Sequence, residues 1–244
     1  ARLVARAEPD GYTVLIGASA THAANASLYR NLGYDPVRDF SPISQLASVP
    51  LVMVVAEASP LRTVAQATEA AKRSPGRLNF GFGNSAGRIA LEMYRSSAGV
   101  EFLTVPYKST PAVVIDVIGG QLDLTIVDTA VALPQMRAGK LRALASTGAK
   151  RWDSLPSVPT MMEQGLRNYE MTGWVAAYVP AGTPAASAGR LGELFHAAAT
   201  SEKVVAGAGS LGMSIQTSSS SELAEFGASE TQKWARYARA AGMQ

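Results

Sequence analysis

The sequence has no cysteine, only two histidines and no long apolar run. The absence of cysteine excludes disulfides, thiolate catalysis and zinc–sulfur sites. Two isolated histidines without clustered carboxylates supply no ligand set for a metal ion, so we predict neither a metal nor a cofactor. Because no stretch reaches the roughly 18 apolar residues of a membrane-spanning helix, we expect a chain that is not embedded in a membrane.

Charge is scarce in this sequence. Charged residues make up 17% of the chain and hydrophobic residues 47%, which is typical of an ordinary folded protein. The formal net charge of +3 comes from scattered lysine and arginine residues rather than from a basic run. Without a basic stripe interleaved with aromatic residues, the sequence predicts no nucleic-acid partner.

The stretch from Phe102 to Gln135 carries the clearest structural pattern. An apolar run at 102–105 predicts a strand, and Thr110-Pro111 is a good helix start because it places a capping hydroxyl before a residue without an N–H. A second apolar run, 122–127, ends at Asp128 and is followed by another helical pattern. This order predicts a βαβ unit with a parallel sheet, in which ligands bind beyond the carboxyl ends of the strands.

The same alternation of strands and helices extends along most of the chain and predicts an α/β fold. Strands are predicted at 12–16, at 43–56 as one or two strands interrupted at Pro50, at 78–82 and at 141–146. Helices are predicted at 23–30, 63–73 and 160–164, as about three turns that follow Gly83–Gly87 and end at Gly99, and after a capping box formed by Ser219 and Glu222. Apolar runs at 51–55 and 171–179 would cross between two lobes. The fold class predicted is therefore α/β with two lobes, each a mainly parallel sheet flanked by helices, joined by two crossing strands. The outer lobe would comprise residues 1–50 and 175–244, and the inner lobe residues 51–174.

Polar residues gather where four predicted strands end and helices begin. The pairs are Ser19 and Thr21, Asn84 and Ser85, Ser109 and Thr110, and Asp128 and Thr129. Each pair alone is explained by the preference for such residues as helix caps. Four pairs in one topology instead favour a site where hydroxyls and free backbone amides hold an anion. His22 and Gly87 lie in the same loops and join the candidates, and Trp174 either stacks on a ligand or fills the core.

An enzymatic alternative rests on Gly83 to Gly87, which matches the G-x-S-x-G elbow of α/β hydrolases. In this alternative Ser85 is the nucleophile, His196 the base and Asp128 the residue that orients the base. Three features weigh against it: His196 is predicted to lie in the middle of a helix, no HGGG-type oxyanion segment is present, and the only other histidine, His22, belongs to a different loop. The two function classes left open are a binding receptor and a serine hydrolase.

A series of ordered motifs resembles one known family. The motifs are Pro9–Thr13, Tyr34–Pro36, Val105–Lys108, Gly119–Asp123, Ala138–Ala143, Leu155–Thr160 and Pro180–Pro184. Together they are similar to the Bug-type solute receptors of tripartite tricarboxylate transporters. The resemblance implies a periplasmic-binding-protein-like fold, a small carboxylate held between the lobes, and no catalysis. It also implies a periplasmic location and membrane components of the transporter as partners, and we expect a monomer. The family's polar loop residues carry over onto Ser19, Thr21, Asn84, Ser85, Asp128, Thr129 and Trp174.

The sequence also departs from the family pattern. Family members usually carry Asp-Asn where this chain has Asp128-Thr129, and they place a further strand, loop and helix before the Pro9–Thr13 motif. The present sequence begins at Ala1 without a signal peptide. We therefore expect the strand at 12–16 to have an unpaired edge.

Overall fold

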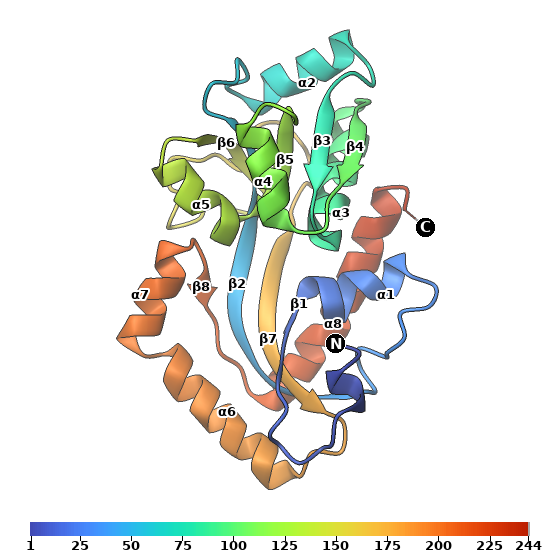
Figure 1. The fold of residues 1–244 in the computed structure, drawn as a ribbon, viewed down its shortest axis with the longest axis vertical. Coiled ribbons are helices and arrows are strands. Elements are labelled where there is room, and N and C mark those ends of the chain that lie inside the picture. Colours follow the sequence, from blue (N-terminus) through green and yellow to red (C-terminus); the bar gives the residue numbers. More distant parts are fainter. Residues whose placement is uncertain (244) are drawn as a thin grey trace.

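Residues 1–243 are described by a computed structural model, shown in Figure 1. The strand order is β1-β7-β2-β5-β3-β4, and β6 and β8 pair with β2 outside this path. We call β1, β7, β8 and residues 40–50 of β2 the outer sheet, and β3 to β6 with residues 51–56 of β2 the inner sheet. The strand bounds are β1 Leu15–Ala18, β2 Phe40–Ala56, β3 Asn79–Phe82, β4 Leu103–Pro106, β5 Leu124–Asp128, β6 Leu141–Ser146, β7 Thr172–Pro180 and β8 Ser214–Ile215.

The strand β2 is 17 residues long and contributes to both sheets. Its first part pairs antiparallel with β7 from Phe40 to Pro50, and from Leu51 on it pairs with β5 and then β6. The predicted interruption at Pro50 is wrong. Pro50 sits where the strand changes partners, so the missing N–H falls between two ladders and the extended backbone continues.

The inner sheet confirms the predicted βαβ unit. Strand β4, helix α4 (Thr110–Ile118), strand β5 and helix α5 (Thr129–Arg137) follow in the predicted order. Both β4 and β5 pair parallel with β3, so β3 lies between them. Helices α2 (Val64–Arg73) and α3 (Ser85–Ala98) complete this half of the molecule.

The outer sheet differs from the predicted one. Every pairing among β1, β7, β2 and β8 is antiparallel, whereas a mainly parallel sheet was expected in each lobe. The cause is that β2 and β7 traverse the molecule in opposite directions and are neighbours over most of their length. The strand expected at 12–16 forms at Leu15–Ala18, and within residues 1–243 this strand, β1, pairs with β7 and stands at one end of the strand order.

Helical elements from both ends of the chain surround the outer sheet. The elements are η1 (Val4–Arg6), the π-helix η2 (Ala20–Ala24), α1 (Asn25–Leu28), α6 (Ala185–Ala199), α7 (Glu202–Ser210) and α8 (Ser220–Ala240). Figure 1 shows α6 and α7 beside β2 and β8, with α8 on the other side of β2 and β7. The helix expected at 23–30 is instead a π-helical turn followed by one short α-helical turn.

A second local prediction also fails. Residues 160–164 form turns rather than a helix. Thr160 and Glu163 form the two hydrogen bonds of a capping box. The Thr160 Oγ1 accepts from the Glu163 N–H, and a Glu163 side-chain oxygen accepts from the Thr160 N–H. Gly165 follows with a positive φ of 92° and turns the chain away before a helix can extend.

Alternate residues of β2 face opposite sides of the inner sheet, as a strand's two-residue period requires. Leu51, Met53 and Val55 belong to one buried cluster, and Val52 and Val54 belong to another. Helices therefore cover both faces of this sheet, and the loops at its strand ends are left to carry polar groups. No helix within residues 1–243 is long and apolar enough to cross a membrane.

Candidate functional site

Three polar side chains meet at the carboxyl ends of the inner strands. Asn84, Thr110 and Asp128 follow β3, β4 and β5, and Figure 1 shows β3 and β4 pointing toward the outer sheet. Asn84 Nδ2 donates to Asp128 Oδ2 at 3.0 Å and to Thr110 Oγ1 at 3.3 Å. The Asn84 Oδ1 accepts from the Gly87 N–H at 2.8 Å and caps α3, which fixes the amide so that its NH₂ group faces Asp128.

The loops after β3 and β4 approach each other closely at Gly83. A Cβ on Gly83 would lie 2.3 Å from the Ser109 carbonyl carbon and 2.3 Å from the Thr110 nitrogen. Only glycine permits this contact, and it brings Asn84 within reach of Thr110. Ser109 stands exposed at the start of α4 without a side-chain cap bond, so its hydroxyl remains available.

Asp128 is half-buried at the end of β5. Burial raises the pKa of its carboxyl, and the hydrogen bond from Asn84 opposes that rise. A carboxyl group with a raised pKa stays protonated to a higher pH. A second acid or a carboxylate can then lie beside it with less charge repulsion. The site therefore contains one group whose charge depends on its surroundings.

Ser85 connects the inner sheet to the outer one. Its Oγ donates to Asn25 Oδ1 at 2.7 Å, and Asn25 belongs to α1, which follows the loop after β1. Gly87 lies two residues further along α3, where a Cβ would be 3.0 Å from the Ile126 carbonyl oxygen. Asn25 was not among the site residues predicted from the sequence, because it lies inside the helix predicted at 23–30. The sequence feature that could have identified it is its position one helical turn after Thr21.

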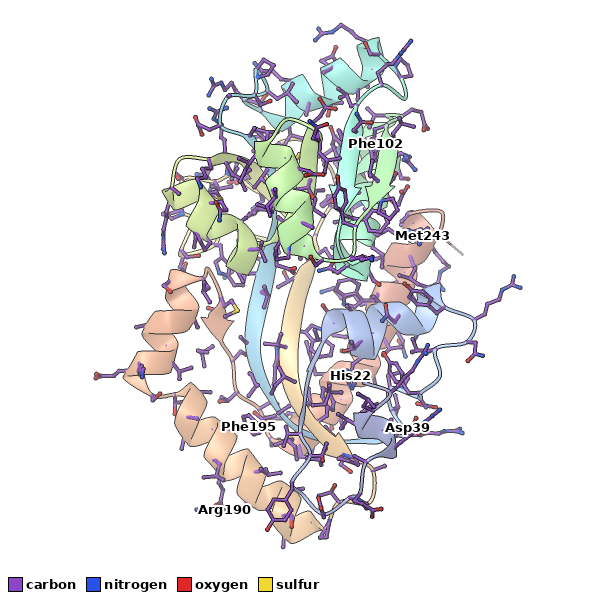
Figure 2. The ribbon with its side chains drawn as sticks, in the orientation of Figure 1. His22, Asp39, Phe102, Arg190, Phe195 and Met243 are labelled. Carbon is purple, nitrogen blue, oxygen red and sulfur yellow. The ribbon has the colours of Figure 1, made fainter. Side chains whose placement is uncertain are left out.

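Ser19, Thr21 and His22 lie on the outer side of this junction. Ser19 is buried beside Gly173 of β7, and the Thr21 Oγ1 both donates to the Ala18 carbonyl and accepts from the Ala18 N–H. The His22 ring stacks on Tyr178 rather than pointing to the inner strand ends. Figure 2 shows His22 in the half of the molecule that contains α8.

Thr129 and Trp174 are engaged elsewhere in the protein. The Thr129 Oγ1 is buried and donates to the Gly212 carbonyl at 3.2 Å, next to the turn into β8. Trp174 is also buried, and its Nε1 donates to Glu230 of α8 at 2.9 Å. Of the two alternatives for Trp174, the structure therefore places it in the core.

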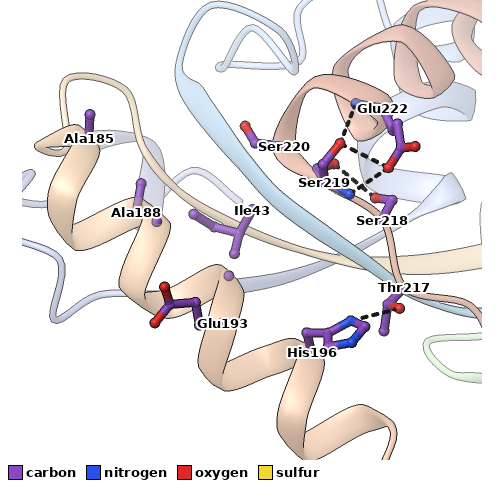
Figure 3. Close-up of a pocket in the computed structure, with 12 residues that line it drawn as sticks. Ile43, Ala185, Ala188, Glu193, His196, Thr217, Ser218, Ser219, Ser220 and Glu222 are labelled. Carbon is purple, nitrogen blue, oxygen red and sulfur yellow. Dashed lines mark hydrogen bonds between the residues drawn. The ribbon is translucent and has the colours of Figure 1, made fainter.

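The structure gives no support to the hydrolase alternative. Ser85 Oγ donates to Asn25, and Asp128 accepts from Asn84. His196 is exposed on α6, where its Nδ1 contacts Thr217 Oγ1 at 3.1 Å (Figure 3). No hydrogen bond joins any two of the three proposed triad members within residues 1–243, so neither base nor orienting residue stands at the serine.

Two open hollows differ in how they lie relative to these groups. One of about 500 Å³ is lined by Thr21, Asn25 and Tyr34, next to the Ser85–Asn25 contact. A larger hollow of about 680 Å³ lies between α6 and the start of α8, where His196 and Ser219 line it (Figure 3). The larger hollow includes none of the strand-end residues, so its size alone does not make it the site.

The fold and the polar junction define the class of protein. An α/β chain whose two sheets share a long strand, with polar strand-end loops facing the opposite half, has the architecture of periplasmic binding proteins. A protein solved under the description periplasmic binding protein BugD superposes with a TM-score of 0.93 at 29% identity, covering 100% of this chain and 82% of that one. The α/β, periplasmic-binding-protein-like fold predicted from the sequence is confirmed, with an outer sheet that is antiparallel instead of mainly parallel.

The chain belongs to the tripartite tricarboxylate transporter family receptor proteins, whose family model matches residues 1–243. An R. palustris protein solved with adipate has a TM-score of 0.95 and 32% identity, covering 99% of this chain and 81% of that one. MatC from Rhodopseudomonas palustris, solved with bound malate, has a TM-score of 0.90 and 25% identity, covering 97% and 82%.

A curated relative gives the same result at the sequence level. The UPF0065 protein in the tcbD-tcbE intergenic region of Pseudomonas sp. (strain P51) is 33% identical over 236 residues, or 95% of this chain and 70% of that protein. A second UPF0065 relative, from Agrobacterium vitis, is covered over 61% of its length. The chain thus spans about 61 to 70% of these two relatives.

Proposed function

We propose that the chain is a non-catalytic extracytoplasmic solute receptor that binds a small carboxylate between two lobes. The observation that carries this proposal is the convergence of Asn84, Thr110 and Asp128, with Ser85 reaching across to Asn25. Backbone N–H groups at the starts of α3, α4 and α5 add partial positive charge at the same edge. Two similar proteins were solved with the dicarboxylic ligands adipate and malate.

The ligand contacts are assigned to the groups nearest this junction. Asn84, Ser85, Ser109, Thr110 and Asp128 supply side chains, and the turn at Gly87 supplies backbone. Ser19 and Thr21 close the site from the outer side. His22, Thr129 and Trp174 instead hold the surrounding backbone, since their polar atoms or rings are used within the protein. The donors are mainly neutral, so binding should depend little on salt.

The two lobes are residues 1–50 with 175–244, and residues 51–174, and they close on the ligand by bending at the crossing strands. The pair Pro50 and Thr172 marks the place where β2 and β7 leave the outer sheet. A hinge there would change the distance between Asn25 and Ser85. The lobes would act in a monomer in the periplasm and deliver the carboxylate to the membrane components of a tripartite tricarboxylate-type transporter.

Thermal unfolding against a panel of mono-, di- and tricarboxylates tests the proposed function. A ligand at 100 times its Kd adds about 2.7 kcal/mol to the free energy of unfolding, which is readily measured as a rise in Tm. Neutral sugars and simple cations serve as controls and should leave Tm unchanged. Stabilisation by sugars or cations, with none by any carboxylate at millimolar concentration, would contradict the proposal.

A further inference from the structure

A contact between α5 and the end of α7 joins the two halves of the molecule. Helix α5 packs against strands of the inner sheet, whereas α7 packs beside α6 and β8 in the outer half. In the view of Figure 1, α5 and α7 lie on one side of the crossing strands β2 and β7, and α1 and α3 lie on the other. Because Ser85 of α3 bonds to Asn25 of α1, the halves are tied on both sides of the strands that connect them.

Two side chains of α5 donate to backbone carbonyls at the end of α7. Arg137, in the last turn of α5, donates from Nη1 to the Ser210 carbonyl at 2.6 Å, and Thr129, at the start of α5, donates from Oγ1 to the Gly212 carbonyl at 3.2 Å. Ser210 is the last residue of α7, where carbonyls have no partner inside the helix and a cation meets the negative end of the helix dipole. No ion pair engages Arg137 within residues 1–243. Its charge is therefore used at this contact.

The turn after α7 also fits closely against α5 at Gly212. This residue has a φ of +74°, and a Cβ placed on it would lie 2.9 Å from the Thr129 Cβ and 3.3 Å from Leu133 Cδ2. Only glycine suits both the backbone conformation and the short distance. Helix α7 has little other anchorage, because Ala208 is its one buried residue. The contact with α5 therefore matters for where the C-terminal end of α7 lies.

We infer that Arg137 is a positioning residue for carboxylate binding, and that its bond to Ser210, together with the Thr129–Gly212 contact, is a latch that holds the two halves together around the ligand. The inference rests on the proposed function. The R. palustris protein solved with adipate superposes on 99% of this chain, both halves included, with a TM-score of 0.95. The halves therefore lie here as they do in a protein solved with a ligand. A contact that exists in this arrangement, and is lost when the halves separate, adds to ligand affinity without touching the ligand.

Substitution of Arg137 tests the latch from the inner half. In Arg137→Gln, affinity for a carboxylate that raises Tm should fall about 3- to 10-fold, the net effect of one hydrogen bond. Stopped-flow binding should assign the loss to faster dissociation with unchanged association, because the latch forms only once the halves have met. Arg137→Lys keeps a charged donor and should recover most of the affinity. Lys140→Gln is the matched control, since it removes the same charge from an exposed position three residues further on.

A pair of glycine substitutions tests the latch from the outer half. Gly212→Ala places a methyl group against Thr129 and should open the latch, again with faster dissociation of the carboxylate. Gly120→Ala is the matched control, because Gly120 has the same φ of +74° but a Cβ on it meets no atom within 4 Å. Both variants carry the same backbone strain, and only Gly212→Ala adds the steric contact.

Hydrogen exchange of the ligand-free protein separates failure of the latch from failure of the proposed function. The amides of residues 202–213 should exchange faster in Arg137→Gln than in Lys140→Gln, because α7 loses its hold on α5. If no carboxylate binds the parent protein, the proposed function fails, and this exchange comparison alone decides the latch. The latch is overturned if the two variants exchange alike over residues 202–213, if they bind a carboxylate with equal affinity, or if Gly212→Ala binds it as Gly120→Ala does.

Discussion

Ser85 is the residue at which a polar strand end of the inner sheet reaches the outer half. Removing its hydroxyl in Ser85→Ala deletes one hydrogen bond at 2.7 Å to Asn25 and one proposed ligand donor. We expect carboxylate affinity to fall by about 1 kcal/mol, measured by calorimetric titration with a carboxylate that raises Tm. Ser97→Ala, at an exposed position on the same helix, is the control and should bind normally.

The opposite result would assign a different role to this serine. Covalent labelling of Ser85 by a fluorophosphonate, or ester hydrolysis lost in Ser85→Ala, would make it a nucleophile after all. The absence of a base beside its hydroxyl is the reason we expect neither.

Asp128 should make carboxylate binding depend on pH. Its pKa is raised by burial, so its neutral form persists to a higher pH than that of an ordinary aspartate. Affinity should rise as pH falls through the pKa of Asp128, because repulsion of the ligand disappears, and should fall again once the ligand itself is protonated. Asp128→Asn should remove the first rise in a titration of Kd against pH. A pH profile identical in both proteins would contradict this role.

The raised pKa of Asp128 also predicts how the stability of the protein depends on pH. A group whose pKa is higher in the folded state than in the unfolded state favours folding below its unfolded pKa, and that contribution is lost as pH rises through the folded value. For Asp128 the loss therefore occurs above the ordinary aspartate range, as pH rises through the raised pKa. Asp128→Asn should therefore gain stability relative to the parent protein at neutral pH more than at acid pH.

At the residue scale the sequence predicted which positions are polar but not where their side chains point. Asn84, Ser85, Thr110 and Asp128 were predictable because the carboxyl ends of neighbouring parallel strands must share one edge. The directions of His22 and Trp174 were not, because each depends on a partner distant in the chain: Tyr178 for the histidine and Glu230 for the tryptophan. Periodicity contains no information on such pairs.

Among the elements, α8 is joined to β7 by a buried carboxylate. Glu230 of α8 is 5% exposed, and its Oε2 accepts from the indole N–H of Trp174 and of Trp234, each at 2.9 Å. Lys233 Nζ lies 3.6 Å from Oε1 of the same carboxylate. This group holds the last helix against a crossing strand.

Glu230→Ala should destabilise the protein strongly, because it leaves two buried indole donors without an acceptor. The expected loss in the free energy of unfolding is roughly 2–5 kcal/mol, measured by denaturant titration. Glu230→Gln keeps an acceptor oxygen and should lose less. Glu225→Ala, at an exposed position on the same helix, is the control, and an equal effect in both alanine variants would show that helix propensity rather than the indole bonds is responsible.

Helix boundaries were predictable from local chemistry, and strand partners were not. Asn84 caps α3 and Gly99 ends it with a φ of +60°, and Ser219 with Glu222 forms the predicted capping box of α8. Such signals lie within a few residues of one another in the sequence. The continuity of β2 through Pro50 depends instead on β5 and β7, which lie far away in the chain, so the local reading of a break was wrong.

At the scale of the whole molecule, ligand binding should change its dimensions. If the lobes close by bending near Pro50 and Thr172, the radius of gyration from small-angle scattering should decrease when a stabilising carboxylate is added. A non-stabilising sugar at the same concentration is the control. An unchanged radius of gyration at saturating ligand would argue for a rigid receptor. The sequence predicted two crossings, but the pairing between them emerges only from the three-dimensional structure.

The shared strand β2 has a consequence for how the protein folds. Its first eleven residues pair within one sheet and its last six within the other, so a single segment contributes to both sheets. Neither half can be excised as a complete folding unit, because cutting at their boundary severs the backbone of a central strand. Loss of order in one half removes a neighbour from the other, and we therefore expect the two halves to melt in a single cooperative transition in a calorimetric scan.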